Sequence, residues 1–136
     1  VQANLTQAET LIRSTSADLL VLPEFFNTGY LFTSEKEVSM LSECSNQGPT
    51  VTFLRQMAAE TGTAIVAGFP ESAHGVFFNS CVLVTPDQET HLYRKTHLFD
   101  REKLFFQPGN TGFNTFNYKK VKIGMMICFD WFFPGE

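Results

Sequence analysis

The chain has 136 residues, enough for one domain with one hydrophobic core. Its content of 43% hydrophobic and 18% charged residues is typical of a globular protein and argues against a disordered tail. The net charge of −4, with no long run of either sign, gives no support to nucleic acid or an anionic membrane as a partner.

The N-terminal segment predicts a helix followed by a short strand. Asn4 or Thr6 can cap the helix, and residues 14–16 are expected to end it. Residues 19–22 form a wholly apolar run, which is typical of a parallel strand covered on both faces. The helix carries apolar residues at helical spacing, namely Leu5, Ala8, Leu11 and Ile12.

A second helix and strand follow a polar segment. Residues 33–48 are polar and small, and they predict a loop with a helical turn. Pro49 suits the first turn of a helix and Gly62 suits its C-terminal end. Residues 64–69 predict another buried strand. The helix places four apolar residues on one face, namely Val51, Leu54, Met57 and Ala58.

The rest of the chain predicts strands interrupted by one long loop. The order of helices and strands is typical of an α/β layered fold with a mixed sheet. No linker or internal repeat divides the chain, so we expect part of one domain. The predicted strands are residues 77–85, 89–95, 113–118 and 121–128, and residues 97–111 form the loop with a short helix.

Three reactive residues each stand at the end of an apolar run: Glu24, Lys95 and Cys128. A thiol at the end of a strand lies where α/β proteins place their chemistry. Together the three offer a nucleophile, a carboxylate base in a dry pocket, and a cation that stabilises an oxyanion and favours the thiolate. Taken singly, Glu24 also fits an exposed residue or a helix N-cap after the strand. Lys95 also fits a solvated strand-end lysine, and Cys128 also fits a buried structural thiol.

The other two cysteines differ from Cys128 in their setting. Cys44 and Cys81 do not end a strand before an abrupt break, and both are interpreted as structural thiols. An odd number of cysteines without Cys-x-x-Cys spacing argues against a disulfide framework or a cysteine zinc site. No apolar run approaches the roughly 20 residues of a membrane span, and the start shows no signal-peptide pattern. We therefore expect a cytoplasmic protein with no metal, cofactor or membrane partner.

Three segments resemble the signature blocks of the nitrilase, or carbon–nitrogen hydrolase, superfamily. They occur in the order of the family and at family-like spacing, and the resemblance covers essentially the whole chain. It implies an α/β fold that forms part of a four-layer α-β-β-α sandwich with a mixed sheet. The segments are residues 22–30 (Leu-Pro-Glu-Phe-Phe-Asn-Thr-Gly-Tyr), 93–99 (Tyr-Arg-Lys-Thr-His-Leu-Phe) and 127–134 (Ile-Cys-Phe-Asp-Trp-Phe-Phe-Pro).

The resemblance also implies a role for each matching residue. Glu24 would be the general base, Lys95 would stabilise the tetrahedral intermediate, and Cys128 would form an acyl-thioester. The backbone N–H of Phe129 would be the second oxyanion donor. Glu102 precedes an aromatic-Pro-Gly stretch and matches a second glutamate that many members use. Its alternative interpretation is a solvated loop carboxylate.

The residues around the cysteine bear on the substrate. Nitrile-hydrolysing members usually read Trp-Glu after the cysteine, whereas this chain reads Phe129-Asp130-Trp131. In this segment the chain resembles the amidase and N-carbamoyl-amine hydrolase branches. A small linear amide or carbamoyl amine is therefore expected as substrate rather than a nitrile. Tyr30 and Trp131 are candidates to line the substrate pocket, although both also fit core aromatics.

The chain differs from the family pattern at its ends. The strand expected before the first helix and the second half of the sandwich are absent, so residues 1–136 are expected to be a partial domain, the N-terminal half of a longer protein. Gly135 stands where members usually continue from proline directly to glutamate. The resemblance implies a dimer for the full-length protein.

Two other functions stay open at this point. The glutaminase or acyl-transferase branch of the superfamily uses the same three residues but passes the acyl group or the ammonia elsewhere. The chain could also be a non-catalytic fragment or binding module that keeps the residues without a closed pocket. Half a sandwich would expose large apolar faces and would then associate or aggregate.

Overall fold

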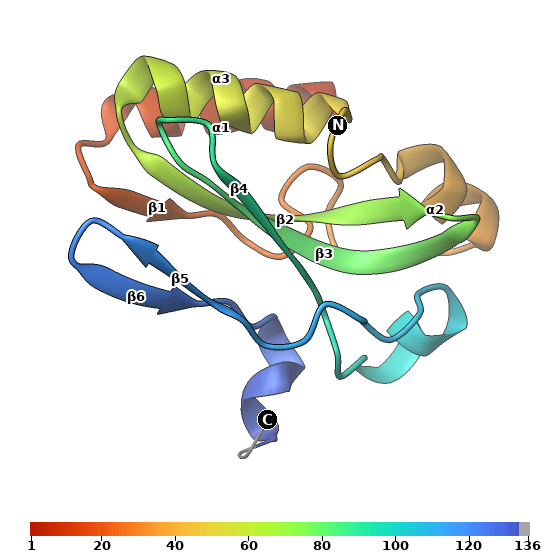
Figure 1. The fold of residues 1–136 in the computed structure, drawn as a ribbon. Helices are drawn as coiled ribbons and strands as arrows, with labels where there is room; N and C mark the ends of the chain where they lie inside the picture. The colour runs from red at the N-terminus through yellow and green to blue at the C-terminus, as the bar shows by residue number, and fades with distance from the viewer. Residues whose placement is uncertain (134–136) are drawn as a thin grey trace.

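Helices cover one face of a four-stranded sheet in the computed structural model, which describes residues 1–133 (Figure 1). The first strand pairs in parallel with the second, and the remaining pairs are antiparallel. This arrangement confirms the expected α/β architecture with a mixed sheet. In spatial order the strands are β1 (Leu19–Val21), β2 (Ala64–Ala73), β3 (Val76–Val84) and β4 (Thr90–Arg94).

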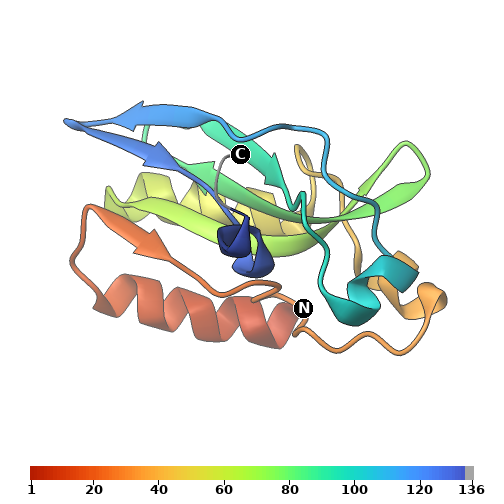
Figure 2. The same cartoon turned by 90° about the horizontal axis from the view of Figure 1, so that it is seen from below.

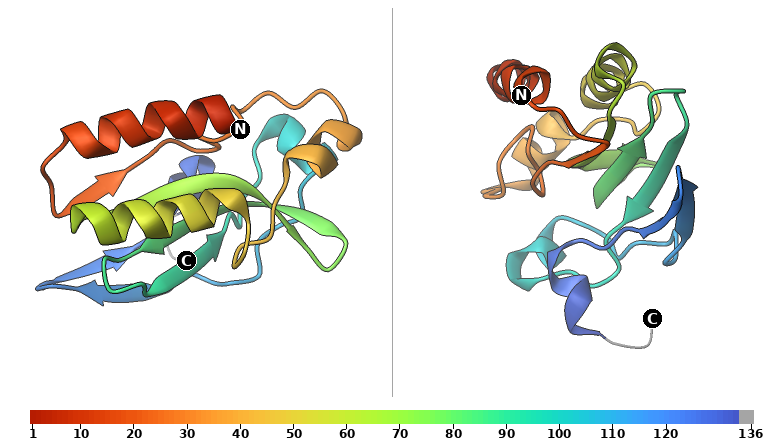
Figure 3. Two further views of the ribbon diagram at one scale, coloured as in Figure 1. Left: turned by 90° about the horizontal axis from the view of Figure 1, so that it is seen from above. Right: turned by 90° about the vertical axis from the view of Figure 1, so that its left-hand side faces the viewer.

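Two helices, α1 (Gln2–Ser14) and α3 (Pro49–Thr61), lie side by side over the sheet (Figure 3). Proline occupies the first turn of α3, and Gly62 ends the helix in the left-handed conformation with φ of 68°. Both features agree with the prediction. The buried core between helices and sheet contains Ala8, Ile12, Val51, Leu54, Met57, Ala58, Ile65, Ala67, Phe69, Val82 and Val84.

The first helix starts earlier than predicted. It begins at Gln2, so neither Asn4 nor Thr6 is its cap. The amide of Asn4 instead donates to the backbone oxygen of Asn27 at 3.1 Å, and the Thr6 hydroxyl bonds back to Gln2. Leu11 is 57% exposed and does not belong to the buried face. The buried face is therefore narrower than the apolar spacing indicated.

A short helix, α2 (Glu35–Leu41), lies within residues 33–48, where a loop with a helical turn was expected. The Ser34 hydroxyl accepts from the backbone N–H of Glu37 at 3.2 Å, and the Glu37 carboxylate accepts from the backbone N–H of Thr33 at 2.7 Å. These reciprocal bonds resemble a capping box. The pattern of serine followed three residues later by glutamate was present in the sequence and explains why this segment is helical.

A two-stranded hairpin covers the opposite face of the four-stranded sheet (Figure 2). It consists of β5 (Thr115–Tyr118) and β6 (Val121–Gly124), so the last strand is shorter than the predicted residues 121–128. Pairing ends at Gly124 because its partner Thr115 begins β5. Met125 and Ile127 still pack onto the sheet with Ala64, Cys81, Leu83 and Tyr93.

Two short 3-10 helices lie near the functional residues. One spans Asp100–Leu104 within the predicted loop, and the other spans Cys128–Phe132. Cys128 therefore begins a 3-10 turn and does not end a paired strand, which corrects the predicted setting of the thiol. The segment Pro134-Gly135-Glu136, with its unusual glycine, lies outside the described residues.

Candidate active site

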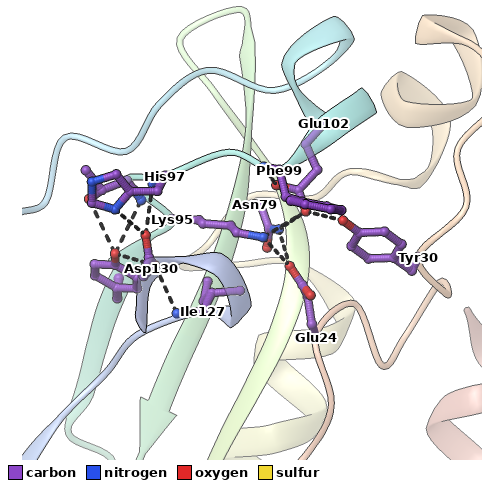
Figure 4. A network of polar contacts seen from close by, with 11 residues as sticks. Glu24, Tyr30, Asn79, Lys95, His97, Phe99, Glu102, Ile127 and Asp130 are labelled. Atoms are coloured by element: carbon purple, nitrogen blue, oxygen red, sulfur yellow. Dashed lines mark hydrogen bonds and ion pairs between the residues drawn. The ribbon is translucent and has the colours of Figure 1, made fainter. Parts of the chain in front are cut away.

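The ammonium of Lys95 lies at the centre of a buried polar cluster (Figure 4). Its side chain is fully buried, and Nζ donates to Oε1 of Glu24 at 2.9 Å and to Oε1 of Glu102 at 2.8 Å. Lys95 follows β4 directly, and its backbone N–H donates to Asn79 O at 2.8 Å. An ammonium has three donors, so within residues 1–133 one N–H is left for a further acceptor. Lys95 is thus a fixed cation with one free donor.

Glu24 reaches the cluster because the chain after β1 passes very close to β2. A Cβ on Gly68 would lie 2.9 Å from Glu24 Cα and 3.0 Å from the backbone nitrogen of Phe25, so only glycine permits this approach. Phe25 is fully buried and adopts a positive φ of 49°, which turns the chain just after the glutamate. Backbone sterics therefore fix where the Glu24 carboxylate stands.

The two oxygens of Glu24 differ in their contacts. Oε1 accepts from Lys95 and also from the Asn79 amide at 2.6 Å. Within residues 1–133, no donor occupies Oε2. The Glu24 side chain retains 19% exposure, so its carboxylate is partly accessible to solvent. Glu24 therefore combines one anchored oxygen with one oxygen that is free to accept a proton.

Glu102 is buried and fully engaged, which excludes the solvated interpretation. Its side chain is 4% exposed. Besides Lys95, its Oε1 accepts from the Tyr30 hydroxyl at 2.6 Å and from the Asn79 amide at 3.4 Å, while Oε2 accepts from the backbone N–H of Phe99 at 3.0 Å. Because both oxygens are occupied, Glu102 is suited to hold Lys95 and less suited to exchange protons.

Cys128 adopts a strained backbone conformation next to this cluster. Its φ of 45° is uncommon for a residue with a side chain, and such strain persists only where neighbours fix it. The thiol is free and the residue is exposed. Unlike Cys128, Cys81 is buried, and burial raises the pKa of its thiol to about 12. Cys44 is exposed, so it is not the buried structural thiol that was expected.

The charges of the cluster act on the thiol of Cys128. Desolvation and the negative charge of Glu24 raise the pKa of Cys128 above its ordinary value, while Lys95 and the backbone N–H of Phe129 lower it. Burial alone would lower the pKa of Lys95, but its bonds to Glu102 and Glu24 outweigh burial and raise that pKa. Together these effects favour the thiol over the thiolate at Cys128 and the charged ammonium at Lys95.

The aromatic candidates are placed differently from one another. Tyr30 lines a cavity next to Glu102, together with Phe32, Phe99 and Phe106, so its position agrees with a pocket wall. Desolvation and the bond to Glu102 raise the pKa of Tyr30, so it stays a neutral donor. Trp131 is 66% exposed and is therefore not a core residue, and its ring contacts that of Phe132 at a tilt of 37°.

Two polar residues of the site were not predicted as site residues. Asn79 is fully buried and links Glu24 to Glu102. Asp130, which entered the sequence argument only as a hint about the substrate, is 1% exposed, and its Oδ1 lies 2.9 Å from Nδ1 of His97. The available signal was a lone amide and a lone acid within otherwise apolar segments. Their partners lie far away in sequence, so that signal alone names no role.

Residues 1–133 contain no helix with the length and apolar character of a membrane span.

The chain matches the carbon–nitrogen hydrolase family over residues 1–136. It is 48% identical over 134 residues to a protein from Pyrococcus abyssi named nitrilase, covering 96% of this chain and 51% of that protein. It is 34% identical over 143 residues to N-carbamoylputrescine amidase from Solanum tuberosum, covering 98% of this chain and 48% of that enzyme.

The fold gives the same result as the sequence comparison. A crystal structure of a CN-hydrolase superfamily protein from Xanthomonas campestris, with an arsenic adduct in its active site, superposes with a TM-score of 0.87 at 29% identity. The match covers 98% of this chain and 49% of that protein. This chain thus spans about half the length of the curated relatives it matches. With sequence and fold in agreement, the chain belongs to the carbon–nitrogen hydrolase family.

Proposed function

We propose that this chain supplies the catalytic residues of a hydrolase that cleaves a carbon–nitrogen bond, other than a peptide bond, in a small linear amide or carbamoyl amine. One observation carries the proposal. Lys95 is a fully buried cation held by two glutamates, and the turn that carries Cys128 is tied to His97, two residues after the lysine, through Asp130. These contacts support the assignment of Cys128 as nucleophile, Glu24 as base and Lys95 as the cation that stabilises the oxyanion.

The first half of the reaction forms an acyl-thioester. Glu24 Oε2 takes the thiol proton of Cys128 as sulfur attacks the carbonyl carbon. The free N–H of Lys95 and the backbone N–H of Phe129 stabilise the oxyanion that develops. When the tetrahedral intermediate collapses, the carbon–nitrogen bond breaks and Glu24 returns its proton to the leaving nitrogen. Ammonia or an amine departs, and the acyl group stays on sulfur.

The second half of the reaction releases the acid. Glu24 accepts a proton from water as the water oxygen attacks the thioester carbonyl. The same two donors stabilise the second oxyanion. Collapse breaks the carbon–sulfur bond, and the proton on Glu24 returns to sulfur. Glu102 keeps its four acceptor contacts throughout, so its proposed role is to hold Lys95 in place.

The raised pKa of Cys128 supports a role for Glu24 as base. A thiol that is protonated at rest reacts only if its proton leaves as the bond to carbon forms. The alternative, a preformed thiolate paired with Lys95, would need the cation to dominate the local charge. Here Glu24 and Glu102 together oppose it.

The substrate has two candidate classes. The sequence Phe129-Asp130-Trp131 favours an amide or carbamoyl amine, and a 34% identical relative is named for a carbamoyl amine substrate. A nitrile is the second candidate because a 48% identical relative is named nitrilase. The two classes differ in the first step, since attack on a nitrile gives a thioimidate nitrogen anion and not an oxyanion.

The test uses the full-length protein with a short aliphatic amide, an N-carbamoyl alkylamine and the matching aliphatic nitrile. We expect ammonia release from the first two, and an acyl adduct on the peptide that contains Cys128 by mass spectrometry. Cys128→Ala should abolish turnover and leave the unfolding midpoint unchanged, because an exposed thiol contributes little packing. Cys44→Ala, which removes another exposed thiol, is the matched control and should keep full activity.

The outcomes separate the possible functions. Release of ammonia from the nitrile alone would select the second class. Transfer of the acyl group to added amine in preference to water would indicate the acyl-transferase branch. If Cys128→Ala kept more than trace activity, the assignment of the nucleophile would be wrong. If all three thiols were alkylated equally and no substrate were cleaved, the catalytic proposal would fail.

A further inference from the structure

Asp130 closes the turn that carries the thiol. Its backbone N–H donates to Ile127 O at 3.1 Å, and its Oδ2 accepts from the Ile127 N–H at 3.0 Å. Cys128 and Phe129 are therefore the two central residues of a turn that is closed by two hydrogen bonds. The strained φ of 45° at Cys128 needs such a closure to persist.

The same carboxylate also binds both sides of Lys95. Oδ2 accepts from the Tyr93 hydroxyl at 2.7 Å, and Oδ1 accepts from the His97 backbone N–H at 2.9 Å and contacts His97 Nδ1 at 2.9 Å (Figure 4). Tyr93 and His97 stand two residues before and two residues after the lysine. Asp130 thus joins the nucleophile turn to the segment that presents the cation.

We propose that Asp130 is a positioning residue for the reaction: it fixes the Cys128 sulfur and the Phe129 N–H relative to Lys95. The proposal rests on the proposed function, because it concerns the same reaction. Asp130 is 1% exposed and has no place at the reacting atoms, so it acts through the turn. Misplacement of reacting groups by about 1 Å can cost about 100-fold in rate.

The test replaces Asp130 by asparagine in the full-length protein. The asparagine side chain has the size of aspartate, but an NH2 group replaces one of the two carboxylate oxygens. That group cannot accept from the donors that bind this oxygen, so half of the contacts of Asp130 are lost. We expect kcat to fall about 100-fold while KM stays within about 3-fold, since the turn sets the geometry of the chemical step. The thiolate titration of Cys128, followed by absorbance against a Cys128→Ala blank, should move down toward the ordinary thiol value as the turn leaves the glutamates.

Tyr93→Phe provides a milder variant that removes one donor to Oδ2, together with the contacts of the hydroxyl with Thr96, and leaves the other contacts of Asp130 in place. It should lower kcat by a smaller factor than Asp130→Asn. The double variant should lose less than the two single losses combined, because Tyr93 and Asp130 share a hydrogen bond. Fully additive losses would overturn the proposal.

Glu71→Gln is the matched control. Glu71 is also a fully buried carboxylate, and it binds Arg94 at 2.7 Å in a second ion pair on the sheet. Its replacement should lower the unfolding midpoint but leave kcat of the folded enzyme and the thiol titration unchanged. An equal loss of kcat at matched stability would show a merely structural role for Asp130 and overturn the proposal. A protein that turned over none of the three substrates would overturn the proposed function. The role of Asp130 would still be decided by the thiol titration, because that measurement needs no substrate.

Discussion

Replacement of Lys95 by methionine leaves two carboxylates in the site without their cation, and the protein should lose stability as well as activity. The lysine side chain is fully buried, and the side chains of Glu102 and Glu24 are 4% and 19% exposed. Removal of one partner of a buried ion pair typically costs about 3–5 kcal/mol, because the remaining charge stays desolvated. Glu24 can recover part of its hydration, so the free-energy losses from the two ion pairs should not be fully additive.

The assay is urea unfolding of the full-length protein together with thermal melting. Each kcal/mol lost from the free energy of unfolding lowers the melting temperature by about 2–4 °C for a domain of 150–250 residues. Addition of Glu102→Gln to Lys95→Met should restore part of the stability, since a neutral amide still accepts from Tyr30. Arg13→Met is the control, because that arginine forms an exposed ion pair with Glu60 and its replacement should barely move the melting temperature.

Two results would refute this reasoning. The first is a Lys95→Met variant as stable as the unmodified protein, which would mean that the lysine is hydrated or unpaired in solution. The second is a double variant less stable than Lys95→Met, which would mean that the carboxylate of Glu102 contributes favourably without the cation. Either result would remove the basis for placing Lys95 at the centre of the site.

The remaining predictions concern the thiol and the backbone beneath Glu24. Glu24→Gln removes a negative charge that raises the pKa of Cys128, so that pKa should fall and iodoacetamide should alkylate the thiol faster at neutral pH. Hydrolysis should drop by about 100-fold or more. Slower alkylation would contradict the direction in which Glu24 is said to shift the pKa of Cys128. Gly68→Ala forces Glu24 away from Lys95 and should lower kcat by at least about 10-fold. Gly124→Ala, where the nearest atom would lie 3.7 Å away, should be tolerated, and equal effects of the two alanines would count against the close approach.

Local signals predicted the two ends of α3, whereas pairing between strands decided where the last strand ends. Pro49 and Gly62 bound α3 because their effects act within one helical turn. The end of the last strand at Gly124 depends on where β5 begins, and no residue near Cys128 carries that information. The strand was therefore predicted too long, although the burial of Met125 and Ile127 keeps the alternation of a strand.

In the site, as in the fold, local features could be predicted from the sequence, whereas features that depend on distant partners could not. The chemistry of Glu24, Lys95 and Cys128 could be read from their types and positions, and their roles stay predictions. The burial of Glu102 could not, because it depends on Tyr30, which lies 72 residues away in the sequence. Asn79 and Asp130 likewise depend on partners from other elements. Polar residues that organise a site are therefore the hardest to recognise from sequence alone.

The single free oxygen of Glu24 has a consequence for the order of events. If Oε2 serves the sulfur, the leaving nitrogen and the incoming water, these three must occupy one position in turn. Water then cannot attack until the first product has vacated that position, and any small amine that lingers there competes with hydrolysis. The balance between hydrolysis and transfer would in that case be decided by how quickly the first product escapes, and not by a different set of catalytic residues.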